Sequence, residues 1–400
     1  MQTTTLPLAS RASDLVGSVI DSSTSLLASQ THDIVRFAMG SPAPEAIPTH
    51  VLAEIGVREI GAEAPDAFDY AATEGDAALR EALLAQLSGT TDATSPERLT
   101  ITSGGMQGLD LAFKLFVDPG DLVVVESPTY TNGSATALSY QADLLEVPVD
   151  AEGMQVDRLE EMIGSGRPPK VIYTIPTFQN PSGASMTLER RHRLLELANR
   201  WGSLVIDDDP YGMLRFAGDA VPSLHELAAG DPLVLSVRTF SKIMAPGLRV
   251  GWVDAAPELQ QLLINAKQAM DTCTNLPMQR LIAGFLRGGH LNEHLTTQRA
   301  VYRARKEAMQ AALTEHFGGE ARWTDPEGGF FLWVTFGPEV DTERLFEVAL
   351  AEGVAFIPGN AFSPSKQFPH ALRVCFAATT PKRIHEGVER LRRAVDKVTS

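Results

Sequence analysis

The chain has 400 residues, of which 44% are hydrophobic and 21% are charged, and its formal net charge is −16. This length predicts two or three domains, and a composition near the globular average excludes an intrinsically disordered chain. The acidic balance argues against nucleic acid and against an anionic membrane as general partners.

Cys273 and Cys375 are the only cysteines, which are too few for a disulfide framework and indicate a reducing compartment. The opening segment lacks the basic stretch followed by an apolar stretch that marks a secretory signal. The sequence has no apolar run of the roughly 18 residues that a membrane-spanning helix needs. We therefore expect a soluble, cytoplasmic protein.

The N-terminal quarter is poor in strand signals. Residues 1–30 are rich in Ser and Thr and have only weak helical periodicity. The segment that follows, up to Pro48, contains several prolines and indicates an extended connector, because proline lacks a backbone donor that a helix needs. Residues 48–62 and 75–89 have the spacing of amphipathic helices, and Asp76 suits a helix start.

From about residue 99, short apolar runs rich in Val, Ile and Leu alternate with helical stretches such as LERRHRLLELANRWG. The runs are LTIT, DLVVVES, ADLLEVPVD, KVIYTIPT, SLVIDDD and LVLSVRT. This alternation predicts a mostly parallel sheet with helices on both faces.

After about residue 255 the pattern becomes helical, with a helix in ELQQLLINAKQAM and a long helical segment over 276–316. The tail then has strands in GGFFLWVTF, GVAFIPG and ALRVCFA, and helices over 342–352 and 381–396. These elements predict a separate α+β unit at the C-terminal end.

The strongest chemical signal is SVRTFSKIMAPGLRVGW, residues 236–252. A strand runs into a turn with two hydroxyls and Lys242, and Arg249 follows seven residues later. Such a loop at the carboxyl end of a strand suits an anionic group bound beside an amine. Taken alone, an ordinary strand end with surface Lys and Arg explains the segment equally well.

A second signal is VIDDDPYGML, a hydrophobic strand that ends in three aspartates. A carboxylate at a strand end can hold a cationic ring nitrogen, and the phenol of Tyr211 can donate to a nearby oxygen. The alternatives are a magnesium site or a solvated turn. Adjacent aspartates on a strand point in alternating directions, so a shared metal ion is not expected.

Three weaker signals follow the same logic. The glycines of TSGGMQGLD expose backbone N–H groups to an anion at a helix start, although a tight turn explains them as well. Asn180 precedes a proline and presents its amide at a strand end, as a plain Asn-Pro turn also would. Arg373 alternates with apolar residues on a strand and needs an acidic partner, in the substrate or in the protein.

No metal site is expected. His290 and His294 have the spacing of a metal pair on one helical face, but HLNEH lacks the HExxH order and a third ligand, which favours a solvated helix face. Cys375 lies in an apolar strand and is expected to be a core residue rather than a nucleophile.

In this order, the segments resemble the fold-type-I pyridoxal-phosphate enzymes, and most closely the class I/II aminotransferases. The broad-specificity aminotransferases for 2-aminoadipate, aromatic and branched-chain substrates are the most similar sub-group, and the catalytic domain of MocR-type regulators is similar too. The resemblance runs from about residue 35 to 396. It includes a YxxxxGxxxLR pattern that starts at Tyr70, and GGFFLWV and GVAFIPGNAF in the tail.

The resemblance implies an α/β fold with a large domain, whose mostly parallel seven-stranded sheet is flanked by helices, and a smaller α+β domain. We expect residues 1–48 to form an N-terminal segment associated with the small domain. Residues 49–290 would form the large cofactor-binding domain and residues 291–400 the small C-terminal domain.

The resemblance also assigns roles by position. Lys242 matches the lysine that binds the cofactor aldehyde and later moves a proton from the substrate Cα. Asp208 matches the carboxylate on the pyridinium nitrogen. Tyr211 and Asn180 match the donors to the phenolic oxygen of the cofactor, and Tyr130 matches the ring stacked on the pyridine.

The phosphate group would be held by backbone N–H groups, by two hydroxyls and by one guanidinium. Tyr70 matches a tyrosine that reaches this phosphate from a neighbouring subunit, which implies a homodimer. The substrate carboxylate would be bound by Arg373, close to the backbone of Gly40. The resemblance assigns the phosphate to five residues of the same chain: Gly105, Met106, Thr239, Ser241 and Arg249.

The leading hypothesis is therefore a pyridoxal-phosphate aminotransferase that moves an amino group between an L-amino acid and a 2-oxo acid by a ping-pong mechanism. The same cofactor also supports a β-lyase, a racemase, an oxidase or a biosynthetic cyclase. A non-catalytic effector module is a third reading, disfavoured because only about 35 residues, poor in basic side chains, precede the matched segment.

Overall fold

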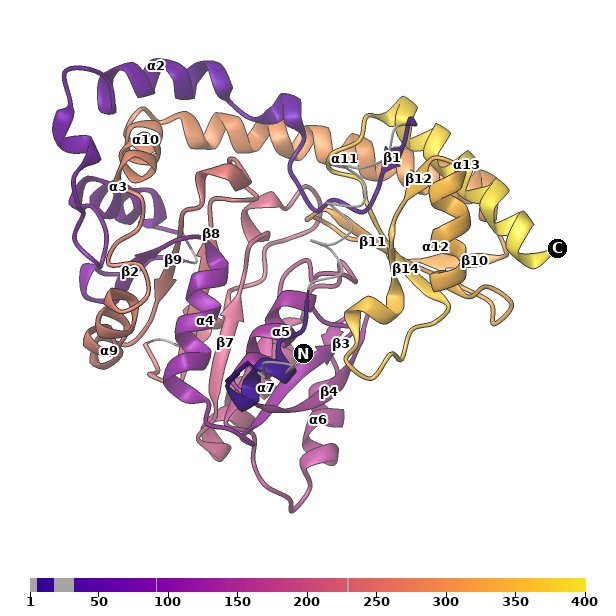
Figure 1. The fold of residues 1–400 in the computed structure, drawn as a ribbon, viewed down its shortest axis with the longest axis horizontal. Coiled ribbons are helices and arrows are strands. Elements are labelled where there is room, and N and C mark those ends of the chain that lie inside the picture. The colour runs from indigo at the N-terminus through magenta and orange to yellow at the C-terminus, as the bar shows by residue number, and fades with distance from the viewer. Residues whose placement is uncertain (1–5, 18–31, 91, 229) are drawn as a thin grey trace, which may run out of the picture.

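The computed structural model describes residues 6–17, 32–90, 92–228 and 230–400. Most of the N-terminal segment in which weak helical periodicity was expected lies outside the described residues. The described part contains an eight-stranded sheet, a four-stranded sheet and one pair of two-residue strands (Figure 1).

The large sheet is mixed, with the order β2-β9-β8-β7-β6-β3-β4-β5. Its five central strands are parallel, whereas β2, β9 and β5 run antiparallel to their neighbours. The strands are β2 (Leu99–Thr102), β3 (Leu122–Ser127), β4 (Asp143–Asp150), β5 (Gly153–Met154), β6 (Val171–Thr174), β7 (Leu204–Asp208), β8 (Val234–Thr239) and β9 (Gly251–Asp254).

Both faces of β3, β6, β7 and β8 are buried, which explains why these strands are mostly apolar runs. In β3, Val123 and Val125 pack toward one hydrophobic core, and Val124 packs toward another. The first core contains α4 (Gly105–Phe116), α5 (Thr131–Ser139) and α9 (Pro257–Gln268), and the second contains α6 (Val156–Ile163), α7 (Leu188–Trp201) and α8 (Leu224–Ala228). The arrangement is a helix–sheet–helix sandwich.

Local signals set the ends of several helices. Asp76 caps α3 (Ala77–Leu87) by accepting a hydrogen bond from the Leu79 N–H, as the sequence predicted. Thr187 caps α7 in the same way, and Gly202 ends that helix in the left-handed conformation at φ 68°. Helix α2 (Thr49–Glu59) and α3 both pack on α10 (Leu276–Arg287).

The C-terminal elements form a second sheet, with the order β10-β11-β14-β13. Its strands are β10 (Ala321–Trp323), β11 (Phe331–Phe336), β13 (Ile357–Pro358) and β14 (Ala371–Cys375). Helix α11 (His290–Phe317) runs from the large sheet to this unit, where it packs on α13 (Pro381–Thr399), which also contacts α12 (Thr342–Ala351) (Figure 1). Near the start of the described chain, β1 (Val35–Arg36) pairs in parallel with β12 (Val354–Ala355).

Short 3-10 helices occupy several connections. They are η1 (Ser10–Asp14), η2 (Pro44–Ala46), η3 (Pro65–Phe68), η4 (Pro96–Arg98), η5 (Gly212–Leu214), η6 (Pro246–Leu248) and η7 (Gly359–Phe362).

The predicted α/β fold is confirmed, and several details differ from expectation. In the smaller sheet, the three-residue β10 was not predicted. The large sheet has eight strands, because the two-residue β5 adds an edge strand that is too short to give a periodic signal. β9 was not predicted as a strand. The long helical segment is two helices, because Gly289 takes a left-handed conformation at φ 72° between α10 and α11. The domain boundaries stay a prediction.

Among the described residues, no helix is long and apolar enough to cross a membrane.

Two mid-helix glycines allow a matched test of the packing around β1. A Cβ on Gly387 in α13 would lie 2.4 Å from the Phe37 ring, whereas a Cβ on Gly56 in α2 would meet its nearest atoms at 3.9 Å. We expect Gly387→Ala to lower the free energy of unfolding by about 1–3 kcal/mol through overpacking. Gly56→Ala should raise it by about 0.5–1 kcal/mol, because alanine loses less entropy in a helix.

Denaturant unfolding of both variants beside the wild type measures the two effects. Equal stabilisation by both substitutions would show that α13 does not pack against β1 as described.

Candidate active site

A cavity of about 220 Å³ lies where the carboxyl ends of the central parallel strands meet residues of the C-terminal unit. β7 ends at Asp208 and β8 ends at Thr239, and both residues line the cavity. All of the predicted site residues except Tyr70 are in this lining: Gly40, Gly105, Met106, Tyr130, Asn180, Asp208, Tyr211, Thr239, Ser241, Lys242, Arg249 and Arg373.

Lys242 follows β8 by three residues and is partly buried in the cavity wall. Its Nζ donates a hydrogen bond of 2.7 Å to the Gly40 carbonyl. Burial lowers the pKa of Lys242 from 10.5 to about 8, and the neighbouring Arg373 and Arg249 act in the same direction. Desolvation is the largest of these causes. The amine is therefore partly neutral near neutral pH, which is the form that attacks a carbonyl carbon.

The three adjacent aspartates at the end of β7, of which Asp207 and Asp208 are its last two residues, face different partners, as strand geometry requires. Asp207 is fully buried and pairs with Arg238 at 3.0 Å. Asp209 accepts hydrogen bonds from the backbone N–H groups of Tyr211 and Gly212. Of the three aspartates, only Asp208 lines the 220 Å³ cavity, and burial raises the pKa of its carboxyl group to about 7.

An anion cradle lies at the start of α4. The helix begins at Gly105 without a side-chain cap, so its first N–H groups are left for a ligand. A Cβ on Gly104 would lie 2.6 Å from the Arg249 guanidinium, so glycine is what lets this cation lie against the helix start. The Thr239 and Ser241 hydroxyls are 2.9 Å apart, and Arg249 is within 3.5 Å of Ser241.

Arg373, on β14, brings a further cation to the lining of the cavity. The side chain is buried, and burial lowers the pKa of its guanidinium to about 10. It donates to Asn180 Oδ1 at 2.9 Å and to the Ala38 carbonyl at 2.6 Å, and it lies 4.2 Å above the Phe331 ring. Its Nε has no hydrogen-bond partner among the described residues.

Two tyrosines complete the wall. Tyr211 is buried, with its ring edge-on to Phe330 and Phe331, and burial raises the pKa of its phenol well above the usual value. Tyr130 is half-buried at the N-cap of α5. Tyr70, in contrast, is 82% exposed and does not line the cavity of its own chain.

Sequence reasoning missed several residues at the site. Met39, Ser41 and Phe331 line the cavity, and Tyr173 donates a hydrogen bond of 2.9 Å to Asp208. A tyrosine inside the aliphatic run VIYT was a signal, because a buried phenol needs a polar partner. The identity of that partner depends on strand order and register, which no local pattern specifies.

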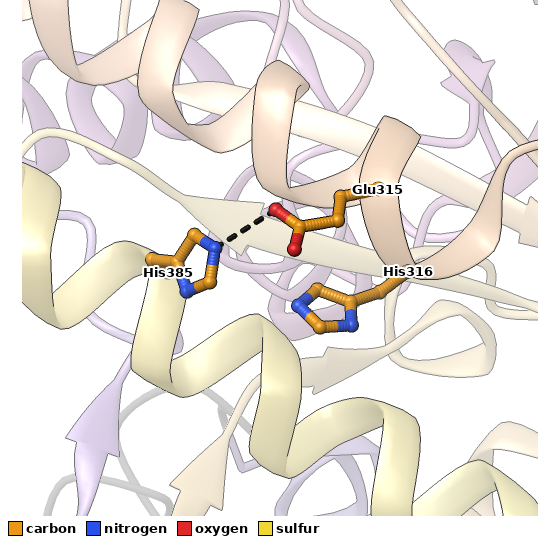
Figure 2. Close-up of side chains that lie close together, drawn as sticks. All are labelled: Glu315, His316 and His385. Atoms are coloured by element: carbon orange, nitrogen blue, oxygen red, sulfur yellow. Dashed lines mark hydrogen bonds and ion pairs between the residues drawn. The ribbon is translucent and has the colours of Figure 1, made fainter.

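The histidines expected on a solvated helix face, His290 and His294, are half-buried and contact the Phe285 ring. Figure 2 shows a different cluster at the junction of α11 and α13, in which ligand atoms of Glu315, His316 and His385 lie within 4.8 Å of one another. In this cluster, Nε2 of the exposed His385 lies 2.9 Å from Oε2 of the exposed Glu315, so an ordinary surface ion pair accounts for the position of the two side chains.

The donor set fits pyridoxal phosphate. The α4 start with Arg249 suits a dianionic phosphate, the buried Asp208 suits a ring nitrogen, and the Lys242 amine suits an aldehyde. The close approach of Arg249 to Gly104 independently supports a phosphate site, since a side chain at residue 104 would extend into the anion cradle.

The comparisons with known proteins agree with this geometry. The family model for aminotransferase class I and II matches residues 33–391. A 2-aminoadipate transaminase of Thermus thermophilus is 40% identical over 92% of this chain and 91% of its own length. An aromatic-amino-acid aminotransferase of Thermococcus litoralis is 38% identical over 90% of this chain and 88% of its own.

Among solved structures, a kynurenine aminotransferase of Pyrococcus horikoshii in complex with PMP superposes with a TM-score of 0.91 at 36% identity, covering 98% of this chain and 97% of its own. The chain belongs to the class I and II aminotransferase family and is a pyridoxal-phosphate-dependent transaminase of amino acids.

Proposed function

We propose that transamination takes place in the cavity between the large sheet and β14, in two half-reactions that share one set of side chains. An L-amino acid leaves its nitrogen at the site and departs as an oxo acid, and a 2-oxo acid then collects the nitrogen. The observation that carries this proposal is the convergence of Lys242, Asp208 and Arg373 on a single cavity.

When bound, pyridoxal phosphate supplies an aldehyde for the amino group and a protonated ring that accepts electron density from the substrate Cα. Lys242 is the proposed attachment point and, once released, the base that takes the Cα proton. Its lowered pKa suits both tasks. Asp208 keeps the ring nitrogen protonated, and Tyr211 and Asn180 donate to the phenolic oxygen.

The phosphate is assigned to the anion cradle at the start of α4. Gly105 and Met106 offer backbone N–H groups, the Thr239 and Ser241 hydroxyls lie close to them, and Arg249 supplies the charge. Because the cradle has no amide or hydroxyl side chain at residues 105 and 106, Arg249 carries much of the electrostatic attraction. The Tyr130 ring is assigned to stack on the pyridine.

Arg373 is the proposed clamp for the substrate carboxylate. Its hydrogen bonds to Asn180 and Ala38 fix the plane of the guanidinium, and the unpartnered Nε is a donor that a carboxylate would satisfy. Gly40 lies beside this position, because a Cβ on Gly40 would lie 3.0 Å from the Phe331 ring and Arg373 lies over the same ring.

The names of the relatives guide the choice of substrates. They act on aromatic amino acids, 2-aminoadipate and kynurenine. We propose that this chain takes amino acids with large side chains. Aromatic amino acids, 2-aminoadipate and kynurenine are therefore the first substrates to test.

We further propose a homodimer in which Tyr70 reaches the phosphate of the neighbouring site. A tyrosine that is 82% exposed on a monomer is a large aromatic surface that association would bury. A cytoplasmic location, and the division into a large domain over 49–290 and a small one over 291–400, also stay predictions.

Release of oxo acid without a second substrate tests the function directly. Cofactor-loaded protein mixed with an aromatic amino acid or 2-aminoadipate alone should release about one equivalent of the matching oxo acid per chain, because the nitrogen stays at the site. Chromatographic quantification of the oxo acid checks this. Racemised or eliminated product without oxo acid would assign one of the other reactions of this cofactor.

The pH dependence of cofactor loading tests the role given to Lys242. Only the neutral amine attacks, so the loading rate should rise with pH and level off above about 8, whereas an ordinary lysine would level off near 10.5. Rapid-mixing absorbance of the apoprotein with pyridoxal phosphate gives the profile, and Nα-acetyl-lysine in the same buffers corrects for titration of the cofactor. A rate that still climbs at pH 10 would contradict the lowered pKa.

Hybrid dimers test the sharing of Tyr70. A dimer of one Lys242→Ala chain and one Tyr70→Ala chain has one doubly defective site and one intact site if Tyr70 acts across the interface. Mixing the two inactive or weakened parents should therefore restore activity, to about half of wild type per hybrid dimer. Activity that stays at the average of the two parents would show that Tyr70 does not serve the partner, and light scattering reports the oligomeric state.

A further inference from the structure

Tyr173 is a buried tyrosine for which the family resemblance gave no role. It lies on β6, next to β7 in the parallel sheet, and its register partner is Ile206. Asp208 is two residues beyond Ile206 and therefore on the same face of the sheet. The Tyr173 side chain spans this diagonal, and its hydroxyl donates to Asp208 Oδ2 at 2.9 Å.

The space around this ring is built by a glycine. A Cβ on Gly133 in α5 would lie 2.4 Å from the Tyr173 ring and 2.7 Å from its hydroxyl oxygen. Phe113 of α4 is a further neighbour, and its ring centre lies 6.3 Å from that of Tyr173. Tyr173 is fully buried, so the phenol is held against Asp208 by packing as well as by its hydrogen bond.

The charges around Asp208 give this hydrogen bond its importance. Burial favours the neutral acid, and among the opposing causes the hydrogen bond from Tyr173 is the largest, ahead of Arg238 on β8. Asp207 on β7 and Asp209, which follows the strand, oppose ionisation of Asp208, and Glu126 on β3 is also close enough to interact. Lys242 favours the ionised form. The pKa of Tyr173 itself is raised well above the usual value, chiefly by burial, so the phenol remains a donor.

We propose that Tyr173 is a positioning residue that holds Asp208 ionised and leaves its other oxygen, Oδ1, to bind the ring nitrogen of the cofactor. This inference rests on the role proposed for Asp208. Without the phenol, the carboxyl group would take up a proton more readily and would compete with the ring nitrogen for it. The ring nitrogen would then be less often protonated, and a carbanion at the substrate would be less stabilised.

Tyr173→Phe tests this, because it removes only the hydroxyl and leaves the ring between Gly133 and Phe113. Tyr140→Phe is the matched control, since the Tyr140 hydroxyl donates to Asp110 and Tyr140 does not line the cavity. Each protein is loaded with pyridoxal phosphate labelled with ¹⁵N in the ring, and the nitrogen chemical shift is followed from pH 6 to pH 9.

In wild type and Tyr140→Phe, the ¹⁵N chemical shift should correspond to a protonated ring nitrogen at every pH up to 9. In Tyr173→Phe, it should move toward the unprotonated value, and kcat should fall about 10- to 100-fold, the scale of a buried hydrogen bond to a charged group. An unchanged nitrogen shift in folded Tyr173→Phe would overturn the inference. Circular dichroism of the variant establishes that it is folded, and the affinity of its apoprotein for the cofactor gives a second readout, expected to weaken.

Asp208→Asn separates this inference from the proposed function. If Asp208→Asn loses the protonated nitrogen and Tyr173→Phe keeps it, the role of Asp208 stands and that of Tyr173 is wrong. If Asp208→Asn also keeps the protonated nitrogen, the role proposed for Asp208 fails, and the inference on Tyr173 fails with it.

Discussion

Desolvation of charged groups around one cavity is the constraint on which the rest of this structure depends. Lys242, Asp208 and Arg373 are each moved toward their neutral forms by burial, to pKa values of about 8, 7 and 10. The protein offsets this with hydrogen bonds to fixed groups, from Tyr173 to Asp208 and from Arg373 to Asn180. The result is a site in which the Lys242 amine can exchange a proton near neutral pH.

The fold explains how these groups come together. The central strands are parallel, so Asp208 at the end of β7 and Thr239 at the end of β8 reach the same edge of the sheet. The C-terminal unit then brings Arg373 to this edge on β14, which pairs with β11 in an antiparallel register. Most of the residues proposed to bind the cofactor thus lie on or next to the large sheet, and the proposed carboxylate clamp lies on the smaller sheet, an arrangement that suits a substrate bound between them.

The sequence predicted the elements whose signal is local. Asp76 marked a helix start, and the runs that became β3, β6, β7 and β8 were apolar because both of their faces are buried. It missed β5, which has only two residues, and the break at Gly289, where a left-handed glycine interrupts a continuous helical periodicity. Most of the residues that line the cavity were named from the sequence because they occur in motifs. Tyr173 and Phe331 were not, because their contribution depends on which distant strand becomes their neighbour.

Peptide mapping after borohydride reduction tests the central claim most directly. Reduction makes the bond between a lysine and the cofactor permanent, so digestion and mass spectrometry identify the lysine that carries the added mass. The account predicts the label on Lys242 alone, with none on the exposed Lys114, and no label in Lys242→Ala. A label on another lysine, or an unchanged label in Lys242→Ala, would contradict the placement of the active site in this cavity.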